Sequence, residues 1–312
     1  MRHTVTVAIC SWNRPALLRQ TLGALGGLCV RPDTRWDLLI VNNGCAKSTT
    51  EVCRAFAGTL PIREVREPRL GLSHARNAAL DQACGDYVLW TDDDVLPDPH
   101  WLEAFLESTE RHPAASAFGG RVDPWFQVPP DPDLLEAFPA LRRGFCGLDH
   151  GPEEIELPPG KNVFGANMAF AMSAIRDMRF DPNLGRSGRR QIGGEELKFV
   201  EQLRARGGRV VWCPAMRLRH LVAQERATLS YLQRFYFGVG QHEVILGGIP
   251  SGTRLLGVPR WLLRRYVELA YRELRWRSVR RRVQALVALR ERKTVAGMIA
   301  ASVRLRWSRA GG

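Results

Sequence analysis

The feature that most constrains the fold is an alternation of short apolar runs with amphipathic segments over the first hundred residues. Three segments contain the apolar runs expected of strands, residues 4–10, 36–43 and 85–94, and residues 61–67 form a weaker predicted strand. Between them, residues 14–25 and 71–84 carry apolar side chains at helical spacing. Strands that alternate with helices form a sheet covered by helices, so we predict an α/β fold with a mostly parallel central sheet.

Polar clusters follow three of the predicted strands. They span Ser11 to Arg14, Asn42 to Gly44, and Asp92 to Asp94. In a parallel sheet the carboxyl ends of the strands share one edge, and ligands bind in the crevice there. We therefore expect the three clusters to meet in one site.

The cluster Asp92, Asp93 and Asp94 suggests a metal site. Alternate side chains of an extended segment share a face, so Asp92 and Asp94 should project together while Asp93 points away. Two carboxylates on one face suit Mg²⁺ or Mn²⁺ with a diphosphate. The alternative is that these acids cap the helix that follows them. We favour the metal site.

Six motifs occur in the order seen in family 2 glycosyltransferases, and the chain resembles this family over about residues 4–240. The motifs are VAICSWNRPALLRQTL, LLIVNNG, GLSHARNAAL, GDYVLWTDDDVLPDPHWL, FGANMAF and GGEELKFVEQLRARGG. The resemblance implies a GT-A fold and an inverting enzyme that uses a nucleoside-diphosphate sugar. It further implies a catalytic domain at residues 1–245, with a nucleotide-binding half (1–118) and an acceptor half (119–245). A basic helical extension, 246–312, follows.

The resemblance also implies a donor site. Asp94 would be the direct ligand of a Mn²⁺ or Mg²⁺ cofactor, and Asp92 would contact the metal or the ribose. His220 lies where many members place a further metal ligand, although a lone histidine is as often an ordinary core or surface residue. The predicted nucleotide- and donor-binding residues are Ser11, Asn13, Arg14, Asn42, Asn43, Arg76, Asn77, Asp92 and Asp93.

One departure from the family concerns the base of the donor. The family usually has an aspartate after the second strand that contacts the base, whereas this chain has Asn42 and Asn43. An amide oxygen still accepts a hydrogen bond, but no carboxylate is present there. The sequence therefore does not predict a uridine-based donor over one that carries thymidine or guanosine.

The resemblance places the general base at Glu195 or Glu196, with Glu196 the first choice, because the family has Glu-Asp there. The alternative is a pair of acids favoured by a helix N-terminus. Two preceding glycines permit close approach of a ligand, which favours catalysis. Gly165, Ala166 and Asn167 match a loop that contacts the donor sugar or the acceptor; alternatively they are small strand residues packed under a helix.

The positive charge of the chain is confined to its tail. Residues 254–309 hold 16 of the 45 Arg and Lys and three of the 32 acidic residues, which leaves 29 of each sign in the rest. A basic amphipathic helix with Trp261, Trp276 and Trp307 could lie on an anionic membrane and serve a lipid-linked or polysaccharide acceptor. The alternative is a helical cap with solvated arginines.

Three further expectations complete the prediction. Scattered cysteines and the lack of an apolar run of about 18 residues favour a cytoplasmic protein, or one peripheral on the inner face of the membrane. A nucleic-acid-binding protein acting through the arginine-rich tail is a rival, but it gives the polar clusters no role, so no nucleic acid is expected. A catalytically lapsed nucleotide-sugar-binding homologue is the other alternative.

Overall fold

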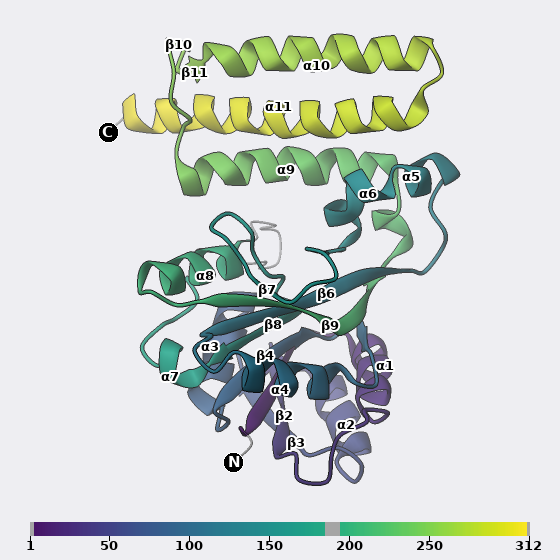
Figure 1. Cartoon of the computed structure of the whole chain (residues 1–312), viewed down its shortest axis with the longest axis vertical. Helices are drawn as coiled ribbons and strands as arrows, with labels where there is room; N and C mark the ends of the chain where they lie inside the picture. The colour runs from purple at the N-terminus through teal and green to yellow at the C-terminus, as the bar shows by residue number, and fades with distance from the viewer. Residues whose placement is uncertain (1–2, 185–193, 311–312) are drawn as a thin grey trace. The chain divides into compact units, whose positions relative to one another are not determined.

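The computed structural model describes residues 3–184 and 194–310, and side chains as far as residue 306. The chain forms two compact units (Figure 1). Unit 1 comprises Met1–Trp125 and Gly147–Leu221, and unit 2 comprises Phe126–Cys146 and Val222–Gly312. We describe each unit by itself.

Unit 1 begins with a parallel sheet. Its strands are β1 (Val5–Ser11), β2 (Trp36–Asn43), β3 (Ile62–Glu67) and β4 (Tyr87–Asp92), in the spatial order β3-β2-β1-β4. The connecting helices are α1 (Pro15–Leu25), α2 (Lys47–Phe56) and α3 (Leu72–Gln82). Consecutive residues of β1 and β2 are buried, as expected of strands covered on both faces. The predicted α/β class is confirmed.

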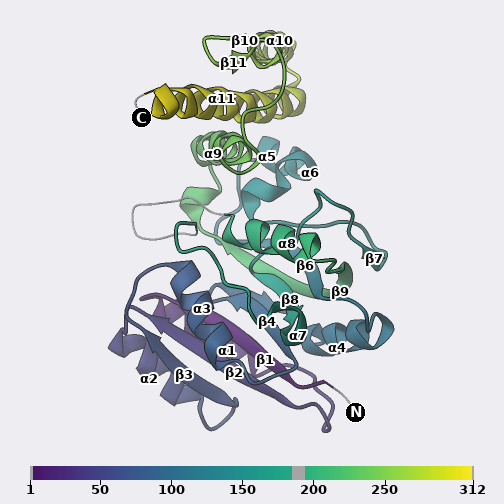
Figure 2. The ribbon, with the colours of Figure 1, turned by 90° about the vertical axis from the view of Figure 1, so that its left-hand side faces the viewer.

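The sheet continues beyond β4 with antiparallel strands, which Figure 2 shows from the side. These are β8 (Asn167–Ala171), β6 (Ala117–Phe126), β9 (Val210–Val222) and β5 (Val95–Pro97), with β7 (Ile155–Glu156) paired to β9. The helices of this part are α4 (Trp101–Arg111), α7 (Met172–Ile175) and α8 (Glu195–Ala205). Its core is rich in fully buried aromatic side chains, including Trp101, Phe118 and Phe170.

Unit 2 is helical. It contains α5 (Pro132–Glu136), α6 (Phe138–Leu141), η1 (Arg142–Phe145), η2 (Gln224–Arg226), α9 (Leu229–Gly247), α10 (Arg260–Ser278), α11 (Arg282–Ala310) and the hairpin β10 (Arg254–Leu255)–β11 (Val258–Pro259). Both views place α11 between α9 and α10 (Figures 1 and 2). Among the described helices, none is both long and apolar enough to cross a membrane.

The boundary of unit 2 differs from the division expected at residue 245. Phe126–Cys146 and α9 both belong to unit 2, because they bond to each other and to α11. Arg290 of α11 donates a hydrogen bond to the carbonyl of Ala140, and the backbone N–H of Gly144 donates to the Tyr236 hydroxyl of α9. The sequence shows no periodicity that reveals these contacts.

Two glycines let α9 and α11 touch through their backbones. A Cβ atom on Gly240 would lie 1.8 Å from the carbonyl oxygen of Thr294, and one on Gly297 would lie 1.9 Å from that of Phe237. Both separations are far below van der Waals contact, so only glycine fits at either position.

We therefore predict opposite effects for the same change at two glycines of α9. Gly240→Ala should lower the free energy of unfolding by about 1–3 kcal/mol through overpacking. Gly238→Ala should raise it by about 0.5–1 kcal/mol, because a Cβ atom there meets open space and alanine favours a helix. Urea unfolding followed by circular dichroism measures both. Shifts of the same sign would contradict the close contact of the two backbones.

Candidate active site

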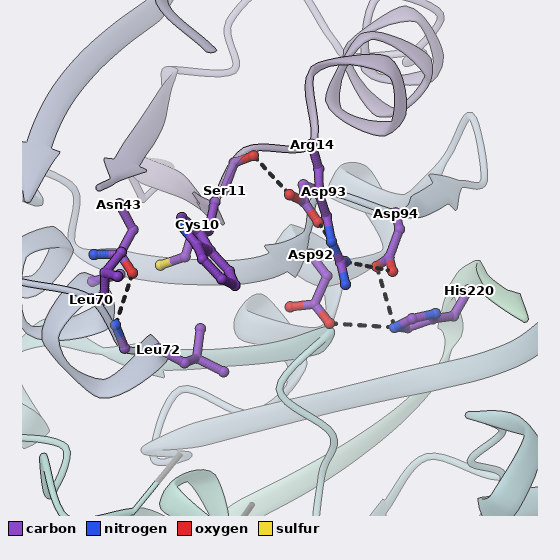
Figure 3. Close-up of a pocket in the computed structure, with 13 residues that line it drawn as sticks. Cys10, Ser11, Arg14, Asn43, Leu70, Leu72, Asp92, Asp93, Asp94 and His220 are labelled. Carbon is purple, nitrogen blue, oxygen red and sulfur yellow. Dashed lines mark hydrogen bonds and ion pairs between the residues drawn. The ribbon is translucent and has the colours of Figure 1, made fainter. Parts of the chain in front are cut away.

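A pocket of about 150 Å³ in unit 1 lies at the carboxyl edge of the sheet (Figure 3). Its polar lining residues are Ser11, Arg14, Asn43, Asp92, Asp93, Asp94 and His220. They come from the ends of β1, β2 and β4 and from β9. The polar clusters that follow the first, second and fourth strands therefore do meet, as the topology predicted.

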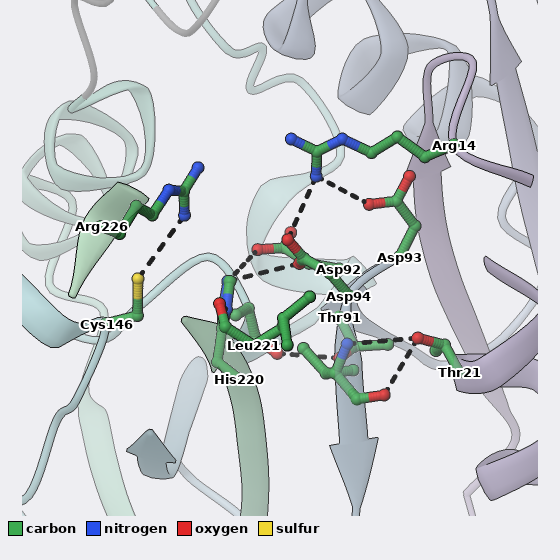
Figure 4. A network of polar contacts seen from close by, with 12 residues as sticks. Arg14, Thr21, Thr91, Asp92, Asp93, Asp94, Cys146, His220, Leu221 and Arg226 are labelled. Atoms are coloured by element: carbon green, nitrogen blue, oxygen red, sulfur yellow. Dashed lines mark hydrogen bonds and ion pairs between the residues drawn. The ribbon is translucent and has the colours of Figure 1, made fainter. Parts of the chain in front are cut away.

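The register of β5 against β9 brings His220 to the aspartates. Val95 lies opposite His220, and the N–H of Leu221 donates to the carbonyl of Asp94 at 2.9 Å. Thr21 of α1 fixes β5, because its hydroxyl donates to the carbonyl of Val95 at 2.9 Å and accepts from the N–H of Val95 at 3.2 Å (Figure 4).

Asp92, Asp94 and His220 form a cluster suited to a metal ion. Nε2 of His220 lies 3.4 Å from a carboxylate oxygen of each aspartate, and the three ligand atoms lie within 4.8 Å of one another. Nδ1 lies 3.0 Å from the carbonyl oxygen of Leu221, to which it must donate. In the neutral ring Nε2 then turns a lone pair toward two carboxylates. One imidazole nitrogen and two carboxylates are a donor set that fits a divalent cation.

Asp93 points away from this cluster, as the alternation of the strand predicted. Its carboxylate accepts from the Ser11 hydroxyl at 2.7 Å and from Arg14 at 3.3 Å. Burial, and next the charge of Asp94, raise the pKa of Asp93 to about 6. Because β5 separates the three aspartates from α4, which begins at Trp101, they do not cap that helix.

The two asparagines after β2 are used differently. Asn42 is fully buried, and its amide bonds to both backbone polar groups of Ala46 and to Glu64. Asn43 lines the pocket, donates to the carbonyl of Arg69 at 2.6 Å and accepts from the N–H of Gly71 at 3.0 Å. The structure therefore brings Asn43, and not Asn42, to the pocket wall.

Arg76 and Glu195 form a buried ion pair between α3 and α8. Nη1 of Arg76 lies 2.8 Å from Oε1 of Glu195, and the two side chains are 3% and 4% exposed. The guanidinium lies 5.3 Å from the Phe180 ring centroid, and a Cβ atom on Gly165 would come within 2.1 Å of it. Any larger residue at position 165 would therefore push the Arg76 guanidinium out of its present position.

The two candidate bases differ in environment. Burial, and next the charge of Glu196, raise the pKa of Glu195 to about 7, while Arg76 opposes the shift. Oε2 of Glu195 is buried and has no hydrogen-bond partner among the described residues. Glu196 is only partly buried. Gly194, with a φ of +98°, is the N-cap residue that precedes α8, and Gly193 lies outside the described residues.

Several predicted residues serve the fold and do not line the pocket. Asn77 exchanges two hydrogen bonds of 2.8 Å with the backbone of Phe180. Asn167 is fully buried and bonds to Trp101 and to the carbonyl of Met216, and the carbonyl of Ala166 accepts from Thr91. Asn13 is exposed, with a φ of +52°. A substrate contact by any of these residues stays a prediction.

The pocket also has an apolar wall, which no sequence motif predicted. It is formed by Trp12, Leu70 and Leu72, of which Trp12 is 51% and Leu70 49% exposed. Large apolar side chains left open to water beside a polar site indicate a ligand with an apolar surface. A tryptophan between Ser11 and Asn13, in the polar cluster after β1, was the signal available in the sequence.

Comparison with solved structures agrees with a glycosyltransferase fold of the GT-A type. A mannosyltransferase from Pyrobaculum calidifontis, solved with GDP-Man and Mn²⁺, superposes with a TM-score of 0.55 at 18% identity, covering 100% of this chain and 76% of the other. Residues 1–349 of TarS from S. aureus superpose with a TM-score of 0.52 at 13% identity, covering 98% and 92%.

Residues 6–129 match the family described as Glycosyl transferase family 2. The succinoglycan biosynthesis protein ExoM of Rhizobium meliloti is 25% identical over 80% of this chain and 77% of its own length. A glucosyl-dolichyl phosphate glucuronosyltransferase of Haloferax volcanii is 27% identical over 74% and 73%. Residues 6–129 therefore form a family 2 glycosyltransferase domain.

The buried ion pair predicts strong coupling between Arg76 and Glu195. Arg76→Met should cost about 3–5 kcal/mol of unfolding free energy, because it leaves a buried carboxylate without a partner. The double variant Arg76→Met/Glu195→Gln should be more stable than the sum of the two single changes implies. Urea unfolding of the four proteins completes this cycle. Additive losses would show that the two side chains do not interact.

Proposed function

We propose that the chain is an inverting, metal-dependent enzyme that moves a sugar from a nucleoside-diphosphate donor to an acceptor hydroxyl. The observation that carries the proposal is the cluster of Asp92, Asp94 and His220 in a pocket with an apolar opposite wall. The family match supplies the reaction class.

The pocket has one side for each half of a nucleoside diphosphate. Figure 3 shows Leu70 and Leu72 on one side and the three aspartates with His220 on the other. The apolar side, which includes Trp12, suits the flat face of a base. On the polar side, Asp92, Asp94 and His220 would hold Mn²⁺ or Mg²⁺, which would neutralise charge on the departing diphosphate.

Glu196 is the proposed general base. Glu195 is held by Arg76 in the interior, whereas Glu196 is partly accessible at the start of α8. A base must come within hydrogen-bond reach of the hydroxyl that it deprotonates. Glu196 takes the proton of the acceptor hydroxyl, and the hydroxyl oxygen bonds to the anomeric carbon. The bond from that carbon to the diphosphate breaks on the opposite side, and the diphosphate leaves with the electron pair.

The names of two relatives support an acceptor that is a growing glycan or a lipid-linked sugar. One belongs to succinoglycan biosynthesis, and the other is named for transfer to glucosyl-dolichyl phosphate. We infer an acceptor of this class for the present chain, and a place of action at the cytoplasmic face of a membrane.

The metal assignment predicts a specific loss of donor binding. Asp94→Ala should abolish Mn²⁺-dependent binding of nucleoside diphosphates, because it removes one of the two carboxylates. Asp98→Ala, an equivalent change at an exposed aspartate outside the pocket, should leave binding unchanged. Calorimetry with UDP, TDP and GDP, with and without Mn²⁺, measures this and identifies the base. Undiminished Mn²⁺-dependent binding by Asp94→Ala would refute the metal assignment.

The base assignment predicts that Glu196→Gln keeps donor affinity and lowers turnover by about 100-fold or more, because it cannot accept a proton. Turnover is measured as donor hydrolysis or sugar transfer, and donor affinity is measured by calorimetry. If Glu195→Gln alone loses turnover at unchanged affinity, the base is Glu195. A wild-type chain that binds a donor in the presence of metal and never turns it over would instead be a catalytically lapsed homologue.

A further inference from the structure

We propose that unit 2 binds anionic membranes through an outer patch formed by Leu255 and Leu256 of the β10–β11 hairpin and by Val267, Tyr271 and Leu274 of α10. The patch lies entirely within unit 2, and the proposal does not depend on the chemistry of sugar transfer. The sequence suggested only that a basic tail could bind a membrane. Here the binding surface is assigned to five apolar side chains and the arginines around them.

The two faces of α10 differ sharply in burial. Leu262 and Leu269 are fully buried in a cluster that includes Val295 of α11. Val267, Tyr271 and Leu274 follow one another at helical spacing and are 65%, 66% and 68% exposed. They lie on the face opposite the buried leucines. An apolar stripe so open to water indicates a partner that covers it.

The hairpin beside α10 presents two more leucines to solvent. Leu255 is 51% and Leu256 77% exposed. The two-residue turn places Leu256 at a φ of +52° and Gly257 at +87°. Such turns favour asparagine or glycine at both positions, and a leucine is strained there. Neither folding nor solubility accounts for a leucine at this tip.

The hairpin and α10 occupy the same layer of unit 2. Figures 1 and 2 both show β10 and β11 beside the first turn of α10, on the side of α11 that faces away from α9. The exposed leucines of the tip and the stripe on α10 therefore belong to one outer layer of unit 2.

The surroundings of the outer patch are strongly basic. Residues 254–282 contain ten arginines, two glutamates and neither lysine nor aspartate. Both glutamates are already paired: Glu268 lies 2.8 Å from Arg264, and the buried Glu273 lies 2.6 Å from Arg277 and 2.8 Å from Arg292. Arg264 is 84% exposed. Exposed apolar side chains flanked by arginines are the layout of a helix that lies in an anionic membrane interface.

The tryptophans named from the sequence contribute less than expected. Trp276 is only partly exposed and lies beside Arg275, while Trp261 is 47% exposed and donates to the carbonyl of Ser251. The side chain of Trp307 lies outside the described residues. The four most exposed of the large apolar side chains in the described residues all belong to the outer patch: Leu256, Leu274, Tyr271 and Val267.

Two other partners fit the outer patch less well. In a two-fold dimer the patch of one subunit would pack against the same patch of the other, so arginines would face arginines. Nucleic acid would satisfy the arginines but not an aliphatic tip and stripe. An anionic lipid surface satisfies both the charge and the apolar side chains.

The test uses the full chain with vesicles of phosphatidylcholine containing about one third phosphatidylglycerol, and with pure phosphatidylcholine vesicles. Wild type should co-sediment with the anionic vesicles at least about tenfold better than with the neutral ones, and salt should weaken that binding. Val267→Ser/Tyr271→Ser/Leu274→Ser should weaken it by about tenfold or more. Leu135→Ser, a matched loss of an exposed leucine on α5, should not.

A second variant separates folding from binding. Leu256→Asn should raise the melting temperature, because asparagine accepts a positive φ, and yet weaken vesicle binding severalfold. Lower stability together with unchanged binding would give Leu256 a structural role and overturn its part in the patch.

Three results would overturn the proposal as a whole. One is equal sedimentation of wild type and the triple variant. Another is a wild-type dimer that the triple variant converts to a monomer in light scattering, which would make the patch a self-association surface. The last is binding of a DNA or RNA duplex that the triple variant loses, with no binding of wild type to anionic vesicles.

Discussion

The antiparallel pairing of β5 with β9 is the interaction on which the pocket of unit 1 depends. It is a short contact, and Thr21 of α1 fixes its geometry by bonding both backbone polar groups of Val95. Through it, a histidine from the far half of the unit stands beside two carboxylates at the end of β4. Without this register the parallel sheet would present acids at its edge and no imidazole, and the donor set for a cation would be incomplete.

The second constraint is the buried pair of Arg76 and Glu195. It ties α3, which follows the parallel strands, to α8, which carries both candidate bases. A buried charge costs free energy unless it is paired. Helix α8 therefore cannot move away from α3 without leaving one of the two charged side chains unpaired or exposed to solvent. The position of Glu196 is thus set from the interior of unit 1.

The parallel half of the fold was predicted well from the sequence, because the spacing of apolar residues differs between strands and helices and is visible in the sequence. The sequence also predicted that Asp93 would point away from Asp92 and Asp94. It did not predict that Asn42, Asn77 and Asn167 are occupied by backbone groups, since an asparagine that fixes a turn and one that binds a ligand look alike in sequence. Trp12 was missed because an exposed tryptophan has no periodic signature. The helical unit was predicted as an extension that begins at residue 246. That it also includes Phe126–Cys146 depends on long-range contacts that leave no local pattern in the sequence.

Arg14 has a consequence for how the pocket is filled. Its guanidinium lies 3.1 Å from Asp94 and 3.3 Å from Asp93, while 44% of its side chain stays open to solvent. It therefore serves as the counter-ion of the carboxylates that the proposed cation would share. A cation bound at Asp94 would compete with Arg14 for that carboxylate, and the displaced guanidinium would remain beside the pocket without that counter-ion. Arg14 would then be placed to pair with a phosphate of the donor, so one side chain could balance the carboxylates before the donor binds and the phosphate afterwards.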